Sequence, residues 1–136
     1  MKKLFSLLLI SMTVLMFSCK EKESERFELL TGTSWEAESL LAGGVDATGP
    51  GGLLEGFTGV ARFKTDGTGT FGSFEGEWAF NSDETKITIN SETLPLPITC
   101  TIIELSSTTL TLQALVPNPE DIMGDPITIE MSFSAQ

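Results

Sequence analysis

The sequence predicts an all-β domain of antiparallel strands. Three observations support this prediction: apolar and polar residues alternate with a period of two from Thr33 onward, turn residues separate the alternating stretches, and no amphipathic helical pattern follows the N-terminal segment. Such alternation is typical of antiparallel strands with one face in a core and the other in water. Short, evenly spaced strands indicate a barrel or a sandwich.

The alternating stretches amount to about eight strands, and their many β-branched residues suit a pleated surface. Within Phe74–Phe80, Trp78 and Phe80 alternate with Glu77 and Ala79. The full set is Ser34–Leu41, Phe57–Lys64, the TGTFGSF stretch after Asp66-Gly67, Phe74–Phe80, Thr85–Asn90, Pro97–Leu105, Thr108–Leu115 and Ile127–Phe133. Between two of these stretches, Asp66-Gly67 is a hairpin signal.

The first eighteen residues have the layout of a secretory signal. Lys2 and Lys3 are followed by an uncharged, mostly apolar run from Leu4 to Phe17 and then by the small residue Ser18. As a helix this run rises about 21 Å, which is less than the ~30 Å core of a bilayer. An uncleaved anchor and a buried core helix are the alternative interpretations.

The cysteine that follows this run carries a sharper signal. Leu15 to Cys19 resembles the lipobox of bacterial lipoproteins. The resemblance implies that the Cys19 sulfur receives a diacylglyceryl group and that Cys19 becomes the first mature residue. Because one acyl chain holds a protein to a membrane only marginally, stable anchoring needs more than one. The alternative is a disulfide between Cys19 and Cys100, which an exported compartment permits.

Residues 19–26 are predicted to form a charged tether. The stretch Lys20–Arg26 contains no large apolar residue and cannot bury enough surface to order itself. Lys20 stands where an Asp retains some lipoproteins at the inner membrane. The resemblance therefore implies an outer-membrane lipoprotein, either facing the periplasm or exposed at the surface. The domain itself is expected over residues 27–136.

The composition argues against nucleic-acid binding and against most enzyme chemistry. The net charge is −11, so the chain lacks the basic surface of a nucleic-acid binder. The sequence has no histidine and no tyrosine, which removes the usual general base and the commonest metal ligand. We therefore expect a non-enzymatic protein without a cofactor.

Other reactive groups have plainer explanations. Cys100 lies among apolar residues in the middle of a predicted strand, as a structural thiol does. Glu75 and Glu77 share the polar face of one strand, which is more typical of a solvated rim than of a glycosidase pair. Glu120, Asp121 and Asp125 lack the spacing of a known calcium loop. No metal site is predicted.

A glycine motif raises the question of nucleotide binding. Gly67 to Gly72 matches G-x-G-x-x-G, which in dinucleotide-binding folds follows a strand and opens a helix. Here a strand pattern follows instead, and no strand–helix–strand unit is visible. The glycines are better explained by a tight turn and by close approach of two backbones.

Several motifs, in order, resemble small bacterial lipocalin-like lipoprotein domains. They are Leu30–Trp35, Asp66–Gly69, Gly76–Trp78 and Ile103–Leu112, within a likeness that spans Phe27 to Ser134. The resemblance implies a closed, antiparallel up-and-down barrel of about eight strands and, more weakly, a ligand cavity. A barrel of this size is either filled by its side chains or holds one small ligand.

Five large aromatic residues are predicted to face inward: Trp35, Phe63, Phe74, Trp78 and Phe80. Filling the core is their default role, and lining a pocket is the alternative. The glycine-rich stretch Ala42–Gly56 is interpreted either as a lid over such a pocket or as a simple insertion.

Two functional hypotheses follow. In the first, the domain is a tethered barrel that binds a small apolar ligand. In the second, the barrel is filled, and its outer surface meets a protein partner in the envelope. A cavity of several hundred cubic ångströms favours the first hypothesis, and a packed interior with exposed apolar residues favours the second.

Overall fold

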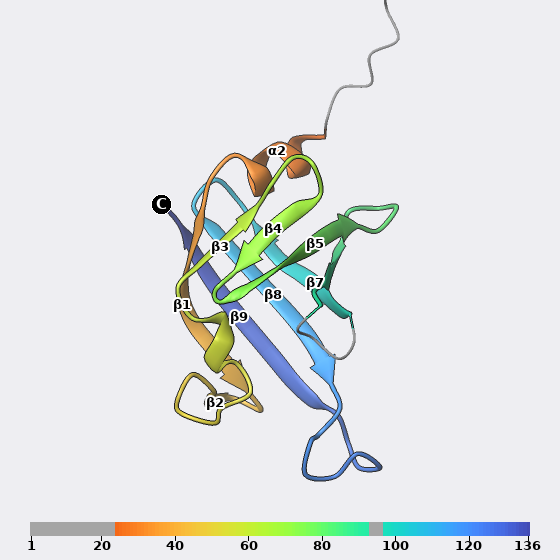
Figure 1. Ribbon diagram of the computed structural model, residues 1–136. Coiled ribbons are helices and arrows are strands. Elements are labelled where there is room, and N and C mark those ends of the chain that lie inside the picture. The colour runs from red at the N-terminus through yellow and green to blue at the C-terminus, as the bar shows by residue number, and fades with distance from the viewer. Residues whose placement is uncertain (1–23, 93–96) are drawn as a thin grey trace, which may run out of the picture.

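The computed structural model describes residues 24–92 and 97–136. The predicted signal, Cys19 and the first part of the predicted tether lie outside these described residues. Within them the chain forms a closed antiparallel barrel with a short helix at one end (Figure 1).

Eight strands form the barrel wall, and a ninth, short strand pairs with the end of one of them. The wall strands pair in the order β1-β3-β4-β5-β6-β7-β8-β9, and β9 pairs back onto β1. Two-residue β2 (Val45–Asp46) pairs only with the end of β1. The wall strands are β1 (Trp35–Ala42), β3 (Val60–Phe63), β4 (Thr68–Phe71), β5 (Phe74–Phe80), β6 (Lys86–Asn90), β7 (Ile98–Leu105), β8 (Thr109–Val116) and β9 (Ile127–Ala135). The predicted antiparallel barrel of about eight strands is confirmed.

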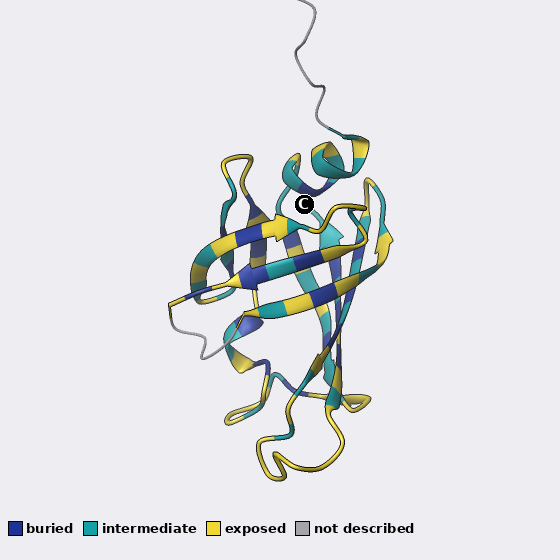
Figure 2. Ribbon diagram, turned by 90° about the vertical axis from the view of Figure 1, so that its right-hand side faces the viewer, coloured by how far each residue is buried: buried dark blue, intermediate teal, exposed yellow. Residues whose placement is uncertain are grey.

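Side chains alternate between the core and solvent along the strands, as Figure 2 shows. On β8, for example, Leu110, Leu112 and Ala114 are buried, and Ile129 and Met131 of β9 face the same core. The alternation slips in β1, where a bulge between Ala37 and Ser39 turns Leu40 inward. A bulge of this kind bends a strand, which helps a sheet to curve.

The helix α2 (Glu25–Thr31) corrects the prediction that no helix follows the signal. Its cap is Ser24, whose hydroxyl oxygen accepts a hydrogen bond from the Phe27 N–H at 3.1 Å. The Arg26 guanidinium donates to the Glu84 carbonyl at 2.9 Å. The last residues of the predicted tether are thus ordered by a helix cap and by a distant turn. No helix of the described residues is both long and apolar enough to cross a bilayer.

This helix seals one end of the barrel. Leu30 is fully buried, and its carbonyl accepts a hydrogen bond from the Trp35 indole N–H at 3.0 Å. The bond satisfies two polar groups that would otherwise be buried without partners. Helix α2 is therefore part of the folded domain.

The glycine motif lies in a hairpin, as the sequence analysis expected. Strands β3 and β4 pair antiparallel through Arg62↔Thr70, and Gly67 takes the left-handed φ of 86° that the turn requires. A Cβ at Gly69 would lie 2.6 Å from the Arg62 carbonyl oxygen. The Thr68 side chain and N–H both donate to the Asp66 carboxylate, and these bonds lower the pKa of that carboxyl group. The motif shapes a turn and opens no helix.

We predict that Leu30→Ala lowers the free energy of unfolding by about 2–5 kcal/mol, because it leaves a cavity under α2. Chemical denaturation of the domain measures this change. The matched control is Glu28→Ala on the exposed side of the same helix, which should cost less than about 1 kcal/mol. Equal losses for the two variants would contradict the assignment of α2 to the core.

Candidate functional site

The five aromatic residues predicted to face inward are divided between the core and its edges. Trp35, Phe63 and Trp78 are buried, whereas Phe74 and Phe80 are half-buried. The Trp78 ring contacts the rings of Phe63 and Phe80 edge-on, with centroids at 5.6 and 5.3 Å. Trp35 instead bonds to α2, and Phe74 packs on Phe57 at 4.8 Å. The structure therefore brings three of the five together and separates the other two.

A very small cavity lies inside the described part of the barrel. Its volume is about 10 Å³, and all of its lining side chains are apolar. They are Phe57, Ala61, Phe63, Phe71, Ile89, Leu112, Met131 and Phe133. Of the five predicted residues, only Phe63 borders it. A space of this size is at the lower limit for one water molecule, whereas ligand pockets measure about 300–1,000 Å³.

Residues 43–59, here called the closing segment, cover the barrel end opposite α2 (Figure 1). The segment includes β2 and the short 3-10 helix η2 (Glu55–Phe57). Its side chains Ala47, Leu54 and Phe57 are buried, and Phe57 forms part of the cavity wall. The sequence pattern predicted a strand at Phe57, where the structure has a 3-10 helix, and it indicated no role for Leu54, because glycines interrupt any periodicity around it.

The closing segment also covers a seam in the wall. β1 and β3 pair only through Trp35↔Ala61 and Glu36↔Val60, so the rest of β1 has no wall strand on that side. The closing segment bonds to this open edge instead: the Ala47 N–H donates to the Leu40 carbonyl at 3.0 Å, and the Ala37 N–H donates to the Gly59 carbonyl at 2.8 Å. The segment thus completes the part of the wall that strand pairing leaves open.

Glycines let the segment pack closely and let its ends adopt left-handed backbone conformations. A Cβ at Gly52 would lie 2.2 Å from the Ala47 carbonyl oxygen, so only glycine fits there. Gly43, Gly44 and Gly59, near the two ends of the segment, have positive φ angles and no atom within 4 Å of a Cβ position. The segment is therefore tightly packed within. At its ends, the Gly43 N–H and the Gly59 carbonyl are hydrogen-bonded to Thr128 and Ala37, but no side chain of the described residues packs against the two glycines.

The interior carries almost no polarity. Ser91 is the one buried polar or charged residue of the described chain, and its hydroxyl donates to the Glu75 carbonyl at 2.6 Å. The thiol of Cys100 is fully buried, and burial raises its pKa from 9.0 to about 12. Such an environment suits neutral, apolar groups and disfavours charged ones.

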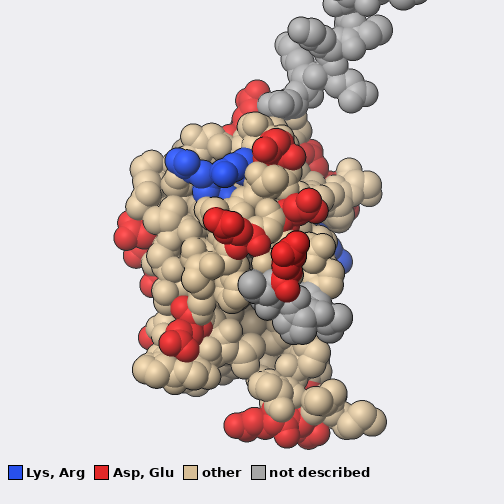
Figure 3. Space-filling model, in the orientation of Figure 1, with Lys and Arg blue, Asp and Glu red and all other residues tan. Residues whose placement is uncertain are grey.

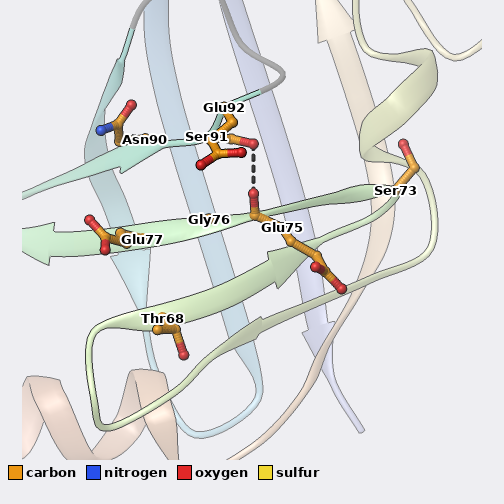
Figure 4. Close-up of a pocket in the computed structure, with 8 residues that line it drawn as sticks. All are labelled: Thr68, Ser73, Glu75, Gly76, Glu77, Asn90, Ser91 and Glu92. Atoms are coloured by element: carbon orange, nitrogen blue, oxygen red, sulfur yellow. Dashed lines mark hydrogen bonds between the residues drawn. The ribbon is translucent and has the colours of Figure 1, made fainter.

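A polar groove of about 730 Å³ runs over the outside of β4, β5 and β6 (Figure 4). It is lined by Thr68, Ser73, Glu75, Gly76, Glu77, Asn90, Ser91 and Glu92. The Glu75 and Glu77 carboxylates point apart in the close-up. Within residues 24–92 and 97–136, no three side chains of the metal-binding types gather closely enough to hold an ion. Glu75 and Glu77 thus do not form the convergent pair of carboxylates that a glycosidase requires.

Comparison with known proteins supports the fold and nothing finer. No protein-family profile matches the chain, and no curated protein matches it at a significant level. Among solved structures, the complex of bovine odorant-binding protein with a selenium-containing odorant is similar. That match has a TM-score of 0.56 and 15% sequence identity, and it covers 88% of this chain and 78% of the bovine chain. The domain is a lipocalin-like barrel.

We predict that the Cys100 thiol is unreactive in the folded protein. At pH 8 a thiol with a pKa of about 12 is ionised about a thousandfold less than an unfolded thiol of pKa 9.0, and only the thiolate reacts. Labelling a Cys19→Ser protein with an aromatic disulfide, with and without denaturant, measures the difference. Because the folded pKa is the higher one, Cys100 also reduces stability as the pH rises from about 9 toward 12. Comparable labelling rates in the two states would contradict the buried position.

Proposed function

We propose that this lipocalin-like domain is a non-enzymatic binding module that takes a small apolar ligand into its barrel when the closing segment withdraws. One observation carries the proposal: a glycine-rich segment closes the barrel with the side chains of Leu54 and Phe57, above a cavity lined only by apolar residues. When Leu54 and Phe57 leave the barrel, the apolar residues beneath them are exposed. A small apolar ligand in the same place would cover those residues again.

The energetics of this exchange set the expected affinity. Exposing a buried Leu or Phe side chain costs about 1.5–3 kcal/mol each. A small ligand must first offset that cost, so its apparent affinity is reduced by the low population of the open state. We expect dissociation constants in the micromolar range, around −8 kcal/mol, for ligands with about the bulk of the displaced side chains.

The fold relative supports the choice of ligand class. The bovine protein, whose fold is similar to that of this domain, is seen in complex with a selenium-containing odorant. The described interior of the present domain has the neutral, apolar lining that such a ligand requires. The absence of histidine and tyrosine from the sequence supports binding without catalysis.

A second candidate function rests on the size of the cavity. At about 10 Å³ the interior is filled, which favours a structural or protein-interaction module that uses the barrel only as a scaffold. Native mass spectrometry of the domain from Glu21, purified from its own cell envelope, separates the two candidates. A bound small molecule supports the first, and ligand-free protein bound to a protein partner supports the second.

The N-terminal sequence supports a proposal for the location. We propose acylation at Cys19 and anchoring in the outer membrane through the acyl chains, with the domain facing the periplasm or the surface. The lipobox-like Leu15–Cys19 sequence and the absence of an Asp at position 20 support this proposal. The net charge of −11 makes attraction to anionic lipids a poor substitute for acyl chains.

We predict that Leu54→Ala raises the affinity for a neutral apolar fluorophore, N-phenylnaphthylamine, about tenfold or more. The reason is that a smaller side chain at position 54 lowers the free-energy cost of withdrawing the closing segment. Fluorescence titration measures the affinity. Leu53→Ala is the matched control, since Leu53 is its chain neighbour and is 40% exposed, whereas Leu54 is 2% exposed. Equal affinities in the two variants, or no binding to either, would contradict entry through the closing segment.

We predict that Cys19→Ser abolishes incorporation of a palmitate analogue and releases the protein from the membrane fraction. Both readouts follow because acyl chains supply the anchoring energy. Cys100→Ser removes the only other cysteine and should leave labelling and fractionation unchanged. Membrane fractionation of Cys19→Ser like that of the parent protein would refute the lipid anchor.

A further inference from the structure

The loop between β8 and β9 projects beyond the rest of the barrel. β1 stays paired with β9 as far as Ala42↔Ile129, while β8 and β9 continue together to Val116↔Ile127. Residues 117–126, here called the tip loop, follow and hang below the barrel end opposite α2 (Figure 1). It is therefore among the most accessible parts of that end.

The tip loop has a built conformation. Pro117, Pro119 and Pro126 each restrict φ, and backbone N–H groups close two turns inside the loop. The Glu120 N–H donates to the Asn118 side chain at 3.0 Å, and the Gly124 N–H donates to the Asp121 carbonyl at 3.0 Å. A loop held in this way loses little conformational entropy when a partner binds it.

The loop presents two adjacent apolar side chains to water. Ile122 is 77% exposed and Met123 is 96% exposed, and Leu115 on the neighbouring strand also faces outward. Single exposed apolar residues are ordinary, whereas adjoining ones form a contiguous apolar surface of the kind that a partner can cover. Met adapts its shape readily to such a pocket.

The charges around this pair identify the partner chemistry. Glu120, Asp121 and Asp125 flank it, and residues 117–126 contain no Lys or Arg. Figure 3 shows that the charged side chains at the lower end of the visible face are all acidic, whereas basic ones lie at the upper end and at the right edge. An anionic bilayer would repel this end. A protein pocket with an apolar floor and a rim of Lys or Arg would complement it.

We infer that the tip loop is a docking site for an envelope protein whose apolar pocket receives Ile122 and Met123 and whose basic rim pairs with Glu120, Asp121 and Asp125. The inference rests on the envelope location proposed above, but it concerns the outer surface and does not depend on ligand binding inside the barrel. If the chain is anchored ahead of α2, the tip faces away from the anchoring membrane.

Photo-crosslinking in cells tests this inference. Benzoylphenylalanine replaces Met123 in the full chain, and the matched control replaces Ile103, which is also exposed and apolar but lies on the barrel wall in β7. We expect position 123, and not position 103, to crosslink to a single protein. The crosslinked site on that protein should lie beside Lys or Arg residues of its surface. Adducts with lipid or with a second copy of this chain, equal adducts from both positions, or no adduct would each overturn the inference.

Binding of the purified partner then tests the chemistry. The Ile122→Ser/Met123→Ser variant should bind the partner at least about tenfold more weakly than the parent protein does. The Ile103→Ser variant should bind the partner with the affinity of the parent protein. Glu120→Lys/Asp121→Lys should weaken binding, and added salt should weaken binding of the parent protein. Unchanged affinity of the apolar double variant, or no effect of charge reversal and salt, would overturn the inference.

Discussion

The pairing of β9 with β1 is the interaction on which the rest of the structure depends. It joins the last strand to the first through seven paired positions from Trp35↔Ala135 to Ala42↔Ile129 and so turns an open sheet into a barrel. Closure removes two exposed sheet edges and lets all inward side chains share one core. It also brings Trp35 under α2, where its indole N–H reaches the Leu30 carbonyl. Barrel closure thus positions Trp35 so that it holds α2 over one end of the barrel.

The same closure leaves a defect on the other side of β1. Because β1 has only two paired positions with β3, the wall there depends on the closing segment and not on a strand ladder. The barrel therefore has one end sealed by a helix and one seam covered by a glycine-rich segment. The void beside Phe57 is small because side chains of the closing segment and of the wall strands fill the interior. Under the proposed function, a ligand would take the space that Leu54 and Phe57 now fill.

Local patterns in the sequence predicted much of this architecture. Period-two alternation identified the strands and the inward direction of Phe63 and Trp78, and Asp66-Gly67 identified the β3–β4 hairpin. Features that depend on distant partners were missed. Helix α2 is held by Glu84, which lies 58 positions from Arg26, and its charged start looked like a tether. Residues 1–23, with Cys19, lie outside the described residues, so acylation stays a prediction.

The candidate site was harder to predict for a physical reason. A period of two tells which side chains face inward but not whether they leave a void, because the cavity volume depends on residues from five strands and from η2.

Hydrogen exchange tests the central claim, that the closing segment withdraws independently of the barrel. We expect the amides of residues 43–59 to exchange through a local opening far more readily than those of β8 and β9. Equal protection, with exchange only through global unfolding, would contradict it.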